Sequence, residues 1–433
     1  MPFLNRPKVI SACWLVCLLV CLTLVGTGVL ISFDIWEING LTVWWRTIIG
    51  IIMIVLGLSL GYFSTLKFFW TIVTWLVKYE RFRNGKGGKG PKIVVIGGGT
   101  GLGTILRGLK EITPHLTAIV TVADDGGSSG RLRREFGILP PGDIRNCLVA
   151  MADIEPLMER LFQYRFTGSS NFAGHNFGNL FLAAMTEITG DFEVAIKESS
   201  KVLAVRGQVL PATPEHVVLK AELIDGRIIT GESEIPKAKT PIKRVYLEPA
   251  GCKPVPEAVV ALKEADIIIL GPGSLYTSVI PNLLVAEIAD AVRNSTAVKI
   301  YVCNAMTQPG ETDNYSASQH LQAIIDHAGP GLVDIALVNT ETITTEILER
   351  YTEEGAKPVR VDLDAITDLG ITPLAVEVIT KNNLIRHDAS KLAQIIFGLY
   401  RTHRIGHALG KSLTKRLNRF LKSCVGLFIA KLS

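Results

Sequence analysis

The sequence predicts an α/β protein with a mostly parallel sheet, helices on both of its faces and a small antiparallel insertion, all preceded by an N-terminal transmembrane helical hairpin. Two observations predict this class. In the second part of the chain, short runs rich in β-branched residues alternate with helical stretches, as in βαβ units. In the first part, long uncharged runs help to raise the apolar share of the 433 residues to 48%, while only 20% are charged. This composition is typical of a chain that lies partly in lipid, and it excludes a disulfide-stapled miniprotein.

The predicted hairpin occupies residues 1–66. Val9–Phe33 has no charged residue, and neither has Thr47–Phe63, which follows an aromatic pair typical of a membrane interface. A cleaved secretory signal is the alternative for the first run, but that run is long for a signal and lacks a clear small-residue cleavage site. Lys and Arg gather before the first run and after the second, so we expect both ends and the main domain on the cytoplasmic side of the inner membrane. Residues 66–77 either extend the second helix or lie along the membrane surface.

Two basic segments flank the main domain, which is predicted over residues 92–400. Residues 67–91 form a basic juxtamembrane segment that ends in a glycine-rich linker. Residues 401–433 form an amphipathic tail with eight Lys or Arg and no acid, although the net charge of the chain is only +5. The domain between them is therefore acidic, so we expect no nucleic-acid partner. The tail suits anionic lipid, with a partner-protein helix as the alternative.

The sheet is predicted from buried-looking runs that are each bounded by Gly, Pro, Asn or Asp. These runs are Ile93–Ile96, Leu116–Val122, Ile267–Leu270, Val298–Cys303 and Ile335–Val338. Residues 205–260 have a different pattern, with a hairpin around Asp225-Gly226 and then a Pro- and Lys-rich stretch. We interpret them as the antiparallel insertion.

A glycine loop follows the first predicted strand and leads into a helix. It comprises Gly97, Gly98, Gly99, Thr100 and Gly101. Glycine lets the backbone approach a phosphate closely, and the helix amino end offers free N–H groups and a positive dipole, so the loop predicts an anion site. A strand-to-helix turn without a ligand is the alternative. The glycine spacing departs from the dinucleotide fingerprint, which makes a NAD-linked oxidoreductase the weakest hypothesis.

Asp124 and Asp125 follow the second predicted strand. Two carboxylates at this edge could hold ribose hydroxyls or a hydrated Mg²⁺ beside a diphosphate, and we expect a metal, ligand or catalytic role for at least one of them. They cannot both point the same way on an extended chain, so one of them could cap the next turn instead.

Three further constellations carry polar groups. LPPGDIRN places polar residues at a helix start, at Asp143, Arg145 and Asn146. His175, Asn176 and Asn179 also begin a helix; they either read a base or sugar, with His175 as acid or base, or form a helix cap with a packed histidine. The loop after Ile267–Leu270 contains Gly273, Ser274 and Tyr276, which either binds a sugar or ring or packs in the core. The sequence has no nucleophile elbow, Walker lysine or zinc helix.

Five ordered motifs make the chain resemble the gluconeogenesis factor (YvcK-like) proteins, relatives of the 2-phospho-L-lactate transferase (CofD-like) enzymes. The motifs are VVIGGGTGLGTILRGLK, VADDGGSSGRLR, PPGDIRNCL, GHNFGNL and GPGSLYTSVIPNLL, within roughly Lys92–Leu399. The resemblance implies a Rossmann-like core with a nucleotide cleft. It implies that the GGGTG loop binds diphosphate, that Asp124 or Asp125 lies near metal or the transferred group, and that Asn176, Asn179 and Tyr276 line the cleft.

Two functions follow from the resemblance. YvcK-like members bind UDP-sugars and are needed for normal cell shape and wall synthesis on gluconeogenic carbon sources, which implies a membrane-tethered UDP-sugar-binding regulator. CofD-like enzymes use Mg²⁺ and transfer a phospholactyl-type group from a guanosine diphosphate donor to a deazaflavin hydroxyl, which implies a transferase. Expected partners are a nucleotide sugar rather than a redox cofactor, membrane lipid, envelope-synthesis proteins and a second copy of the chain. The hairpin is a departure from the soluble form of both groups.

Overall fold

The computed structural model describes residues 20–27, 29–31, 44–45, 47–65, 90–153, 156–169, 171–341, 343–380 and 385–409. The chain divides into two compact units, Met1–Gly87 and Gly88–Ser433. Residues 410–433, most of the predicted amphipathic tail, lie outside the described residues.

The first unit contains one described helix that is long and apolar enough to cross a membrane. It is Thr47–Thr65, 19 residues with a mean hydropathy of 2.1. A shorter apolar helix, Val20–Ile31, packs against it at Gly57, where a Cβ would come within 2.8 Å of the Val25 side chain. Much of Val9–Phe33 lies outside the described residues, so the two-span hairpin and its orientation remain predictions.

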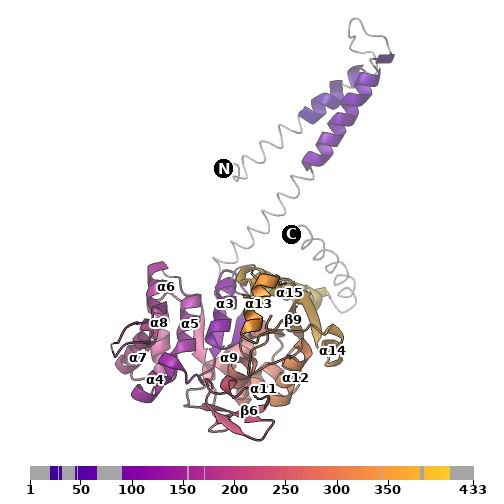
Figure 1. The fold of residues 1–433 in the computed structure, drawn as a ribbon. Coiled ribbons are helices and arrows are strands. Elements are labelled where there is room, and N and C mark those ends of the chain that lie inside the picture. The colour runs from indigo at the N-terminus through magenta and orange to yellow at the C-terminus, as the bar shows by residue number, and fades with distance from the viewer. Residues whose placement is uncertain are drawn as a thin grey trace. The chain divides into compact units, whose positions relative to one another are not determined.

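A seven-stranded sheet forms the centre of the second unit (Figure 1). Its strand order is β10-β9-β8-β7-β1-β2-β3, and every neighbouring pair is parallel. The strands are β1 (Ile93–Gly97), β2 (Leu116–Val120), β3 (Gln208–Pro211), β7 (Ile267–Leu270), β8 (Val298–Val302), β9 (Ile335–Asn339) and β10 (Thr372–Val376). The predicted α/β class with a mostly parallel sheet is confirmed. Two of its strands, β3 and β10, are absent from the sequence prediction.

Every residue of β1, β2 and β7 is buried, so both faces of the sheet are covered. The helices and turns around the sheet are α3 (Gly99–Leu109), α4 (Gly127–Phe136), α5 (Pro141–Met151), α6 (Pro156–Gln163), α7 (Phe177–Thr189), α8 (Phe192–Val202), α9 (Pro256–Glu264), the π-helical turn η2 (Leu275–Val279), α10 (Ile280–Leu283), α11 (Ala286–Asn294), α12 (Ala317–Ala328), α13 (Thr345–Glu353), α14 (Leu363–Asp368) and α15 (Ala389–Leu409), some of which pack on other helices rather than on the sheet itself.

The predicted antiparallel insertion forms a second, three-stranded sheet of order β5-β4-β6. It comprises β4 (Val218–Leu223), β5 (Ile228–Thr230), the 3₁₀ turn η1 (Pro236–Ala238) and β6 (Ile242–Glu248). The hairpin turns at Asp225-Gly226 as predicted, and Gly226 has a φ of 84°, a left-handed conformation that favours glycine. The predicted insertion is too long at its start, because β3 pairs with β2 in the main sheet.

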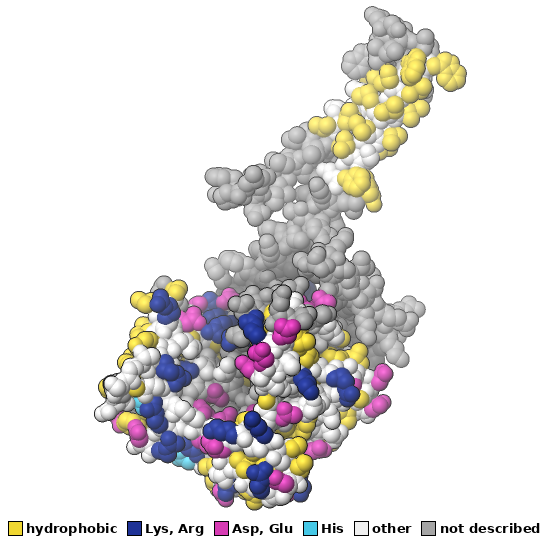
Figure 2. All heavy atoms as spheres, in the orientation of Figure 1, with side chains coloured by type: hydrophobic (Ala, Val, Ile, Leu, Met, Phe, Trp, Pro, Cys, Tyr) yellow, Lys and Arg dark blue, Asp and Glu magenta, His cyan; other side chains and the backbone are white. Residues whose placement is uncertain are grey.

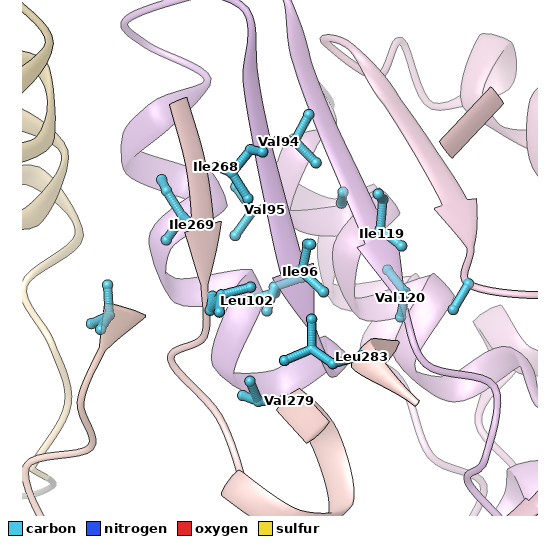
Figure 3. Close-up of a cluster of buried hydrophobic side chains, with 14 of the residues drawn as sticks. Val94, Val95, Ile96, Leu102, Ile119, Val120, Ile268, Ile269, Val279 and Leu283 are labelled. Atoms are coloured by element: carbon cyan, nitrogen blue, oxygen red, sulfur yellow. The ribbon is translucent and has the colours of Figure 1, made fainter. Parts of the chain in front are cut away.

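The core lies where β1, β2 and β7 meet the glycine loop (Figure 3). Val95 and Ile96 of β1 and Ile269 of β7 have no exposed surface, and Leu102 of α3 packs among them. Burying side chains of this size contributes about 1.5–3 kcal/mol each. This packing fixes where α3 begins, and α3 begins at the candidate site.

Candidate functional site

A cavity of about 590 Å³ lies at the carboxyl ends of β1, β2, β7 and β8. Loops that follow all four strands line it, as expected for a ligand site of an open α/β sheet. Of the predicted site residues, the cavity lining includes Gly99, Thr100, Gly101, Asp124, Gly273 and Ser274. Gly97, Gly98, Asp125, His175, Asn176, Asn179 and Tyr276 are not part of it. This volume is within the range of pockets that enclose small-molecule ligands.

The first glycine loop is held tightly by its neighbours. A Cβ on Gly99 would collide with the Asp143 backbone, and a Cβ on Gly101 would collide with the Pro272 carbonyl oxygen. The glycines are therefore needed for loop-to-loop packing, whatever the ligand. In an α-helix the first N–H groups have no intrahelical acceptor, and Thr100 and Gly101, in the first turn of α3, line the cavity. This arrangement suits an anion.

Asp124 and Asp125 point to different places. The Asp124 carboxylate lines the cavity and accepts a hydrogen bond from the Gly126 N–H at 2.9 Å, so it also caps the following turn. Burial, with a smaller contribution from Asp125, raises the pKa of Asp124. The Asp125 carboxylate instead accepts a hydrogen bond from the Ser233 N–H at 2.9 Å and so ties the insertion to the main sheet. Of the two, Asp124 is the one placed to meet a ligand.

Three more carboxyl groups line the cavity, those of Asp143, Glu232 and Glu354, and the first two have a raised pKa. Asp143, at the start of α5, has its pKa raised to about 6 by burial and by Asp124. Glu232, just after β5, has its pKa raised to about 8, first by burial and then by Asp124 and Asp143. Sequence reasoning missed Glu232, because it lies in a charged turn of the insertion with no local motif.

The family resemblance implies a bound Mg²⁺, and the carboxylates of the cavity are the residues that could hold it. Within the described residues no group of three or more His, Cys, Asp or Glu is arranged as a metal cage. Mg²⁺, however, commonly keeps several waters and uses one or two carboxylates together with substrate phosphates. Asp124 raises the electrostatic cost of ionising Asp143, which lines the same cavity. A cation beside them would relieve that cost, so these two residues fit a hydrated Mg²⁺.

The predicted residues of the α7 start lie in a buried polar cluster behind the cavity. Asn176 is the N-cap of α7, and its Oδ1 accepts from the Gly178 N–H at 2.9 Å. His175 Nδ1 lies 3.2 Å from Ser128 Oγ, and burial followed by Arg131 lowers the pKa of His175. These side chains therefore make contacts within the protein rather than at the cavity surface.

One connection leads from this cluster to the cavity. Arg145 donates to Asn179 Oδ1 at 3.0 Å and to Asn146 Oδ1 at 2.6 Å. Asn146 Nδ2 in turn donates to Thr100 Oγ1 at 3.4 Å. Asn179 is thus linked to the glycine loop through Arg145 and Asn146.

Side chains of the loop after β8 hold the loop after β7 in place by hydrogen bonds. Asn304 Nδ2 donates to the Gly273 carbonyl oxygen at 2.8 Å, and Gln308 Nε2 donates to Ser274 Oγ at 2.5 Å. Ser274 Oγ also donates to Oε1 of the buried Glu311 at 3.2 Å, and burial raises the pKa of Glu311 to about 7. The two loops therefore form one rigid wall of the cavity.

Tyr276 lies in the core, one of the two placements that the sequence allows, and not on the cleft, where the family resemblance places it. The chain winds into η2 directly after Ser274, which turns Tyr276 inward while Thr277 and Ser278 line the cavity. Tyr276 is 3% exposed, and its hydroxyl lies 2.8 Å from that of Tyr315. It is a core tyrosine.

The cavity wall opposite the glycine loop comes from a part of the chain without a predicted motif. Tyr351 of α13 accepts a hydrogen bond from the Ile385 N–H through its hydroxyl at 3.0 Å. Arg386 and His387 follow, and burial lowers the pKa of His387 to about 4, so that its ring is neutral. Arg386 brings a positive charge to an otherwise acidic lining.

The family model described as 2-phospho-L-lactate transferase CofD matches residues 93–379, from β1 through β10, and ends before the cavity residues Ile385, Arg386 and His387. The chain belongs to the CofD family. Within the CofD family it is similar to proteins named gluconeogenesis factor. The protein of that name from Halalkalibacterium halodurans is 54% identical over 309 residues, 71% of this chain and 96% of its own length. The one from Bacillus subtilis is 53% identical over 313 residues, 72% of this chain and 99% of its own length.

A solved structure supports the fold. The crystal structure of a UPF0052-family protein from Bacillus halodurans has a TM-score of 0.69 and 53% identity, and covers 71% of this chain and 99% of the solved chain. The match takes in nearly all of the solved chain and supports the α/β fold described above.

Proposed function

We propose that this protein is a membrane-tethered regulator that binds a nucleotide sugar such as a UDP-sugar and supports cell shape and envelope synthesis during gluconeogenic growth. The observation that carries the proposal is the cavity that joins the amino end of α3 to the wall of Tyr351 and Arg386. The similarity of the chain to gluconeogenesis factors, at 54% identity over 71% of the chain, supports the proposed role in gluconeogenic growth.

The ligand is proposed to lie with its diphosphate at the Thr100 and Gly101 N–H groups, where the helix dipole favours negative charge. Asp124 and Asp143 would hold a hydrated Mg²⁺ beside it, and the cation would offset the repulsion between these carboxylates and the diphosphate. The sugar extends toward Tyr351 and Arg386, where a phenol and a guanidinium offer hydrogen bonds to hydroxyl and carbonyl oxygens.

A second candidate is a transferase that moves a phospholactyl-type group from a nucleotide-diphosphate donor to a hydroxyl. The match to the 2-phospho-L-lactate transferase family model favours it, and so does the convergence of Asp124, Asp143 and Glu232. A carboxylate such as Asp124 could accept the proton of the attacking hydroxyl. Glu232, with its pKa of about 8, is protonated at neutral pH and would donate a hydrogen bond.

Calorimetric titration of the full-length chain with UDP-N-acetylglucosamine, GDP and NAD in the presence of Mg²⁺ separates these functions. The proposal expects saturable binding of the UDP-sugar and no released nucleoside monophosphate after prolonged incubation. Tight GDP binding without UDP-sugar binding refutes it in favour of the transferase, and NAD binding alone refutes both.

A further inference from the structure

An apolar surface on α6 and the segment after it has no role in the cavity. It consists of Leu157, Met158, Leu161, Tyr164 and Phe172, and we name it the α6 patch. Leu157 is 72% exposed and Phe172 is 57% exposed, so the patch is open to contact. Contiguous exposed apolar surface on a soluble domain marks an interaction site.

The patch faces outward because α6 uses a different side for its own packing. Phe162 is the buried residue of this helix, and its ring lies 5.7 Å from that of Phe177 and 5.0 Å from that of Phe181. The aromatic ring of Phe166 joins two residues of the patch, because its centroid lies 5.2 Å from that of Tyr164 and 5.8 Å from that of Phe172. The packing of Phe162 on Phe177 and Phe181 thus holds α6 so that the patch residues face outward.

Positive charge borders the patch. Arg160 and Arg165 are exposed, and neither has an acidic partner within the described residues. Glu159, the acid on α6, is already paired with Arg107 at 2.8 Å. Figure 2 shows hydrophobic and Lys or Arg side chains together at the edge where Figure 1 labels α6. An apolar face with a basic border fits the surface of an anionic bilayer.

Contacts place the patch beside the point where the chain enters the domain. Pro91, just before β1, accepts a hydrogen bond from Thr113 Oγ1 at 2.8 Å, just beyond the end of α3. Lys110, at the same end of α3, donates to the Ala152 carbonyl oxygen at 2.6 Å, between α5 and α6. The Arg107–Glu159 pair then joins α3 to α6. The chain therefore enters the domain at this edge, and the basic residues 67–89 precede this point in the sequence.

We propose that the α6 patch docks onto the anionic lipid surface and holds the domain against the membrane. The proposal rests on the membrane tether of the proposed function. Because the chain enters at the amino end of β1 and the cavity lies at the carboxyl ends of the strands, docking at this edge directs the cavity away from the lipid. A soluble ligand then reaches the cavity from the cytoplasm.

Photo-crosslinking of the full-length chain in vesicles of phosphatidylethanolamine and phosphatidylglycerol tests the docking. Benzoylphenylalanine replaces Leu157 in one sample, Leu161 in a second and Ile228 in a control, because Ile228 is apolar and 58% exposed on the antiparallel sheet. Mass spectrometry measures covalent lipid adducts. We expect about tenfold more adduct at the two patch positions, because a side chain at the headgroup–acyl boundary meets lipid continuously.

Three other outcomes would each refute the docking, and each shows which part of the proposal is wrong. If the chain floats with the vesicles but the patch positions give no more lipid adduct than Ile228, the tether holds and the docking is wrong. A protein adduct of doubled mass at the patch positions assigns the patch to a second copy instead. If the chain does not float with the vesicles, the tether fails together with the docking, while nucleotide-sugar binding stands.

Discussion

Single glycines decide whether the cavity forms. Gly101 and Gly103 both lie in the first turns of α3, but their surroundings differ. A Cβ on Gly101 would collide with the Pro272 carbonyl oxygen, whereas on Gly103 the closest atom, the Ala150 Cβ, would be 3.7 Å away, an ordinary contact. The pair therefore separates the effect of loop packing from that of helix propensity.

We predict that Gly101→Ala lowers the melting temperature and removes nucleotide-sugar binding. The added methyl group would push the glycine loop at the start of α3 away from the Pro272 loop that follows β7. Gly103→Ala is the control and should keep binding and gain about 0.5–1 kcal/mol of stability from helix propensity. Thermal unfolding and calorimetric titration measure both. Equal behaviour of the two variants would contradict the packing argument.

Glu232 makes stability depend on pH. Its pKa is raised from an ordinary 4.5 to about 8, so the folded state binds a proton that the unfolded state releases between these values. The contribution of this group to folding stability is then fully present below about pH 4.5 and is lost as pH rises toward 8.

We predict that Glu232→Gln, which cannot ionise, raises stability relative to wild type at pH 8 and leaves it nearly unchanged at pH 4.5. Urea unfolding at several pH values measures this, with Glu234→Gln as the neighbouring control. If the difference in the free energy of unfolding between wild type and Glu232→Gln stays constant between pH 4.5 and pH 8, Glu232 does not titrate in this range.

The sequence predicts site residues best where a local motif and the sheet edge coincide. Gly99, Thr100 and Ser274 follow strands directly, so their placement at the cavity follows from topology alone. Tyr276 has the same neighbourhood in sequence, but the direction of a side chain in η2 depends on the winding of the turn. Arg386 lies far along the chain and carries no glycine signature, so only the tertiary fold brings it to the cavity.

At the scale of elements, α7 shows how a polar motif can serve folding. Asn176 Oδ1 accepts from the Gly178 N–H and from the Asn179 N–H, which satisfies two free donors of the first turn. We predict that Asn176→Ala costs about 1 kcal/mol of stability, that Asn176→Ser recovers most of it, and that both leave ligand affinity unchanged. Denaturant unfolding and titration measure these effects, and a large loss of affinity with unchanged stability would assign Asn176 to the ligand.

The two strands missed by sequence reasoning share a physical cause. Both β3 and β10 are edge strands of the sheet, and both contain a proline, Pro211 and Pro373. Proline is tolerated at an edge because one side of the strand has no partner to which it must donate. The inner strands contain no proline, and their mostly apolar, β-branched runs predict them correctly.

At the scale of the whole molecule, the charge is divided among segments. Residues 401–433 carry eight basic residues and no acid within a chain of net charge +5, and the cavity gathers Asp124, Asp143 and Glu232. We predict that the full-length chain stays in the membrane fraction after a high-salt wash, because salt screens the basic segments but leaves apolar insertion intact. Fractionation and immunoblotting measure this, and release into the soluble fraction would refute an inserted helix at Thr47–Thr65.

The central claim is that the cavity at the carboxyl edge of the sheet binds a nucleotide sugar through the first turn of α3. Hydrogen exchange of the full-length chain with and without UDP-N-acetylglucosamine and Mg²⁺ tests it most directly. The account predicts slower exchange in residues 99–104 and 272–278, with the α6 patch unchanged. Binding that leaves both segments unprotected, or protects only residues away from the cavity, would contradict it.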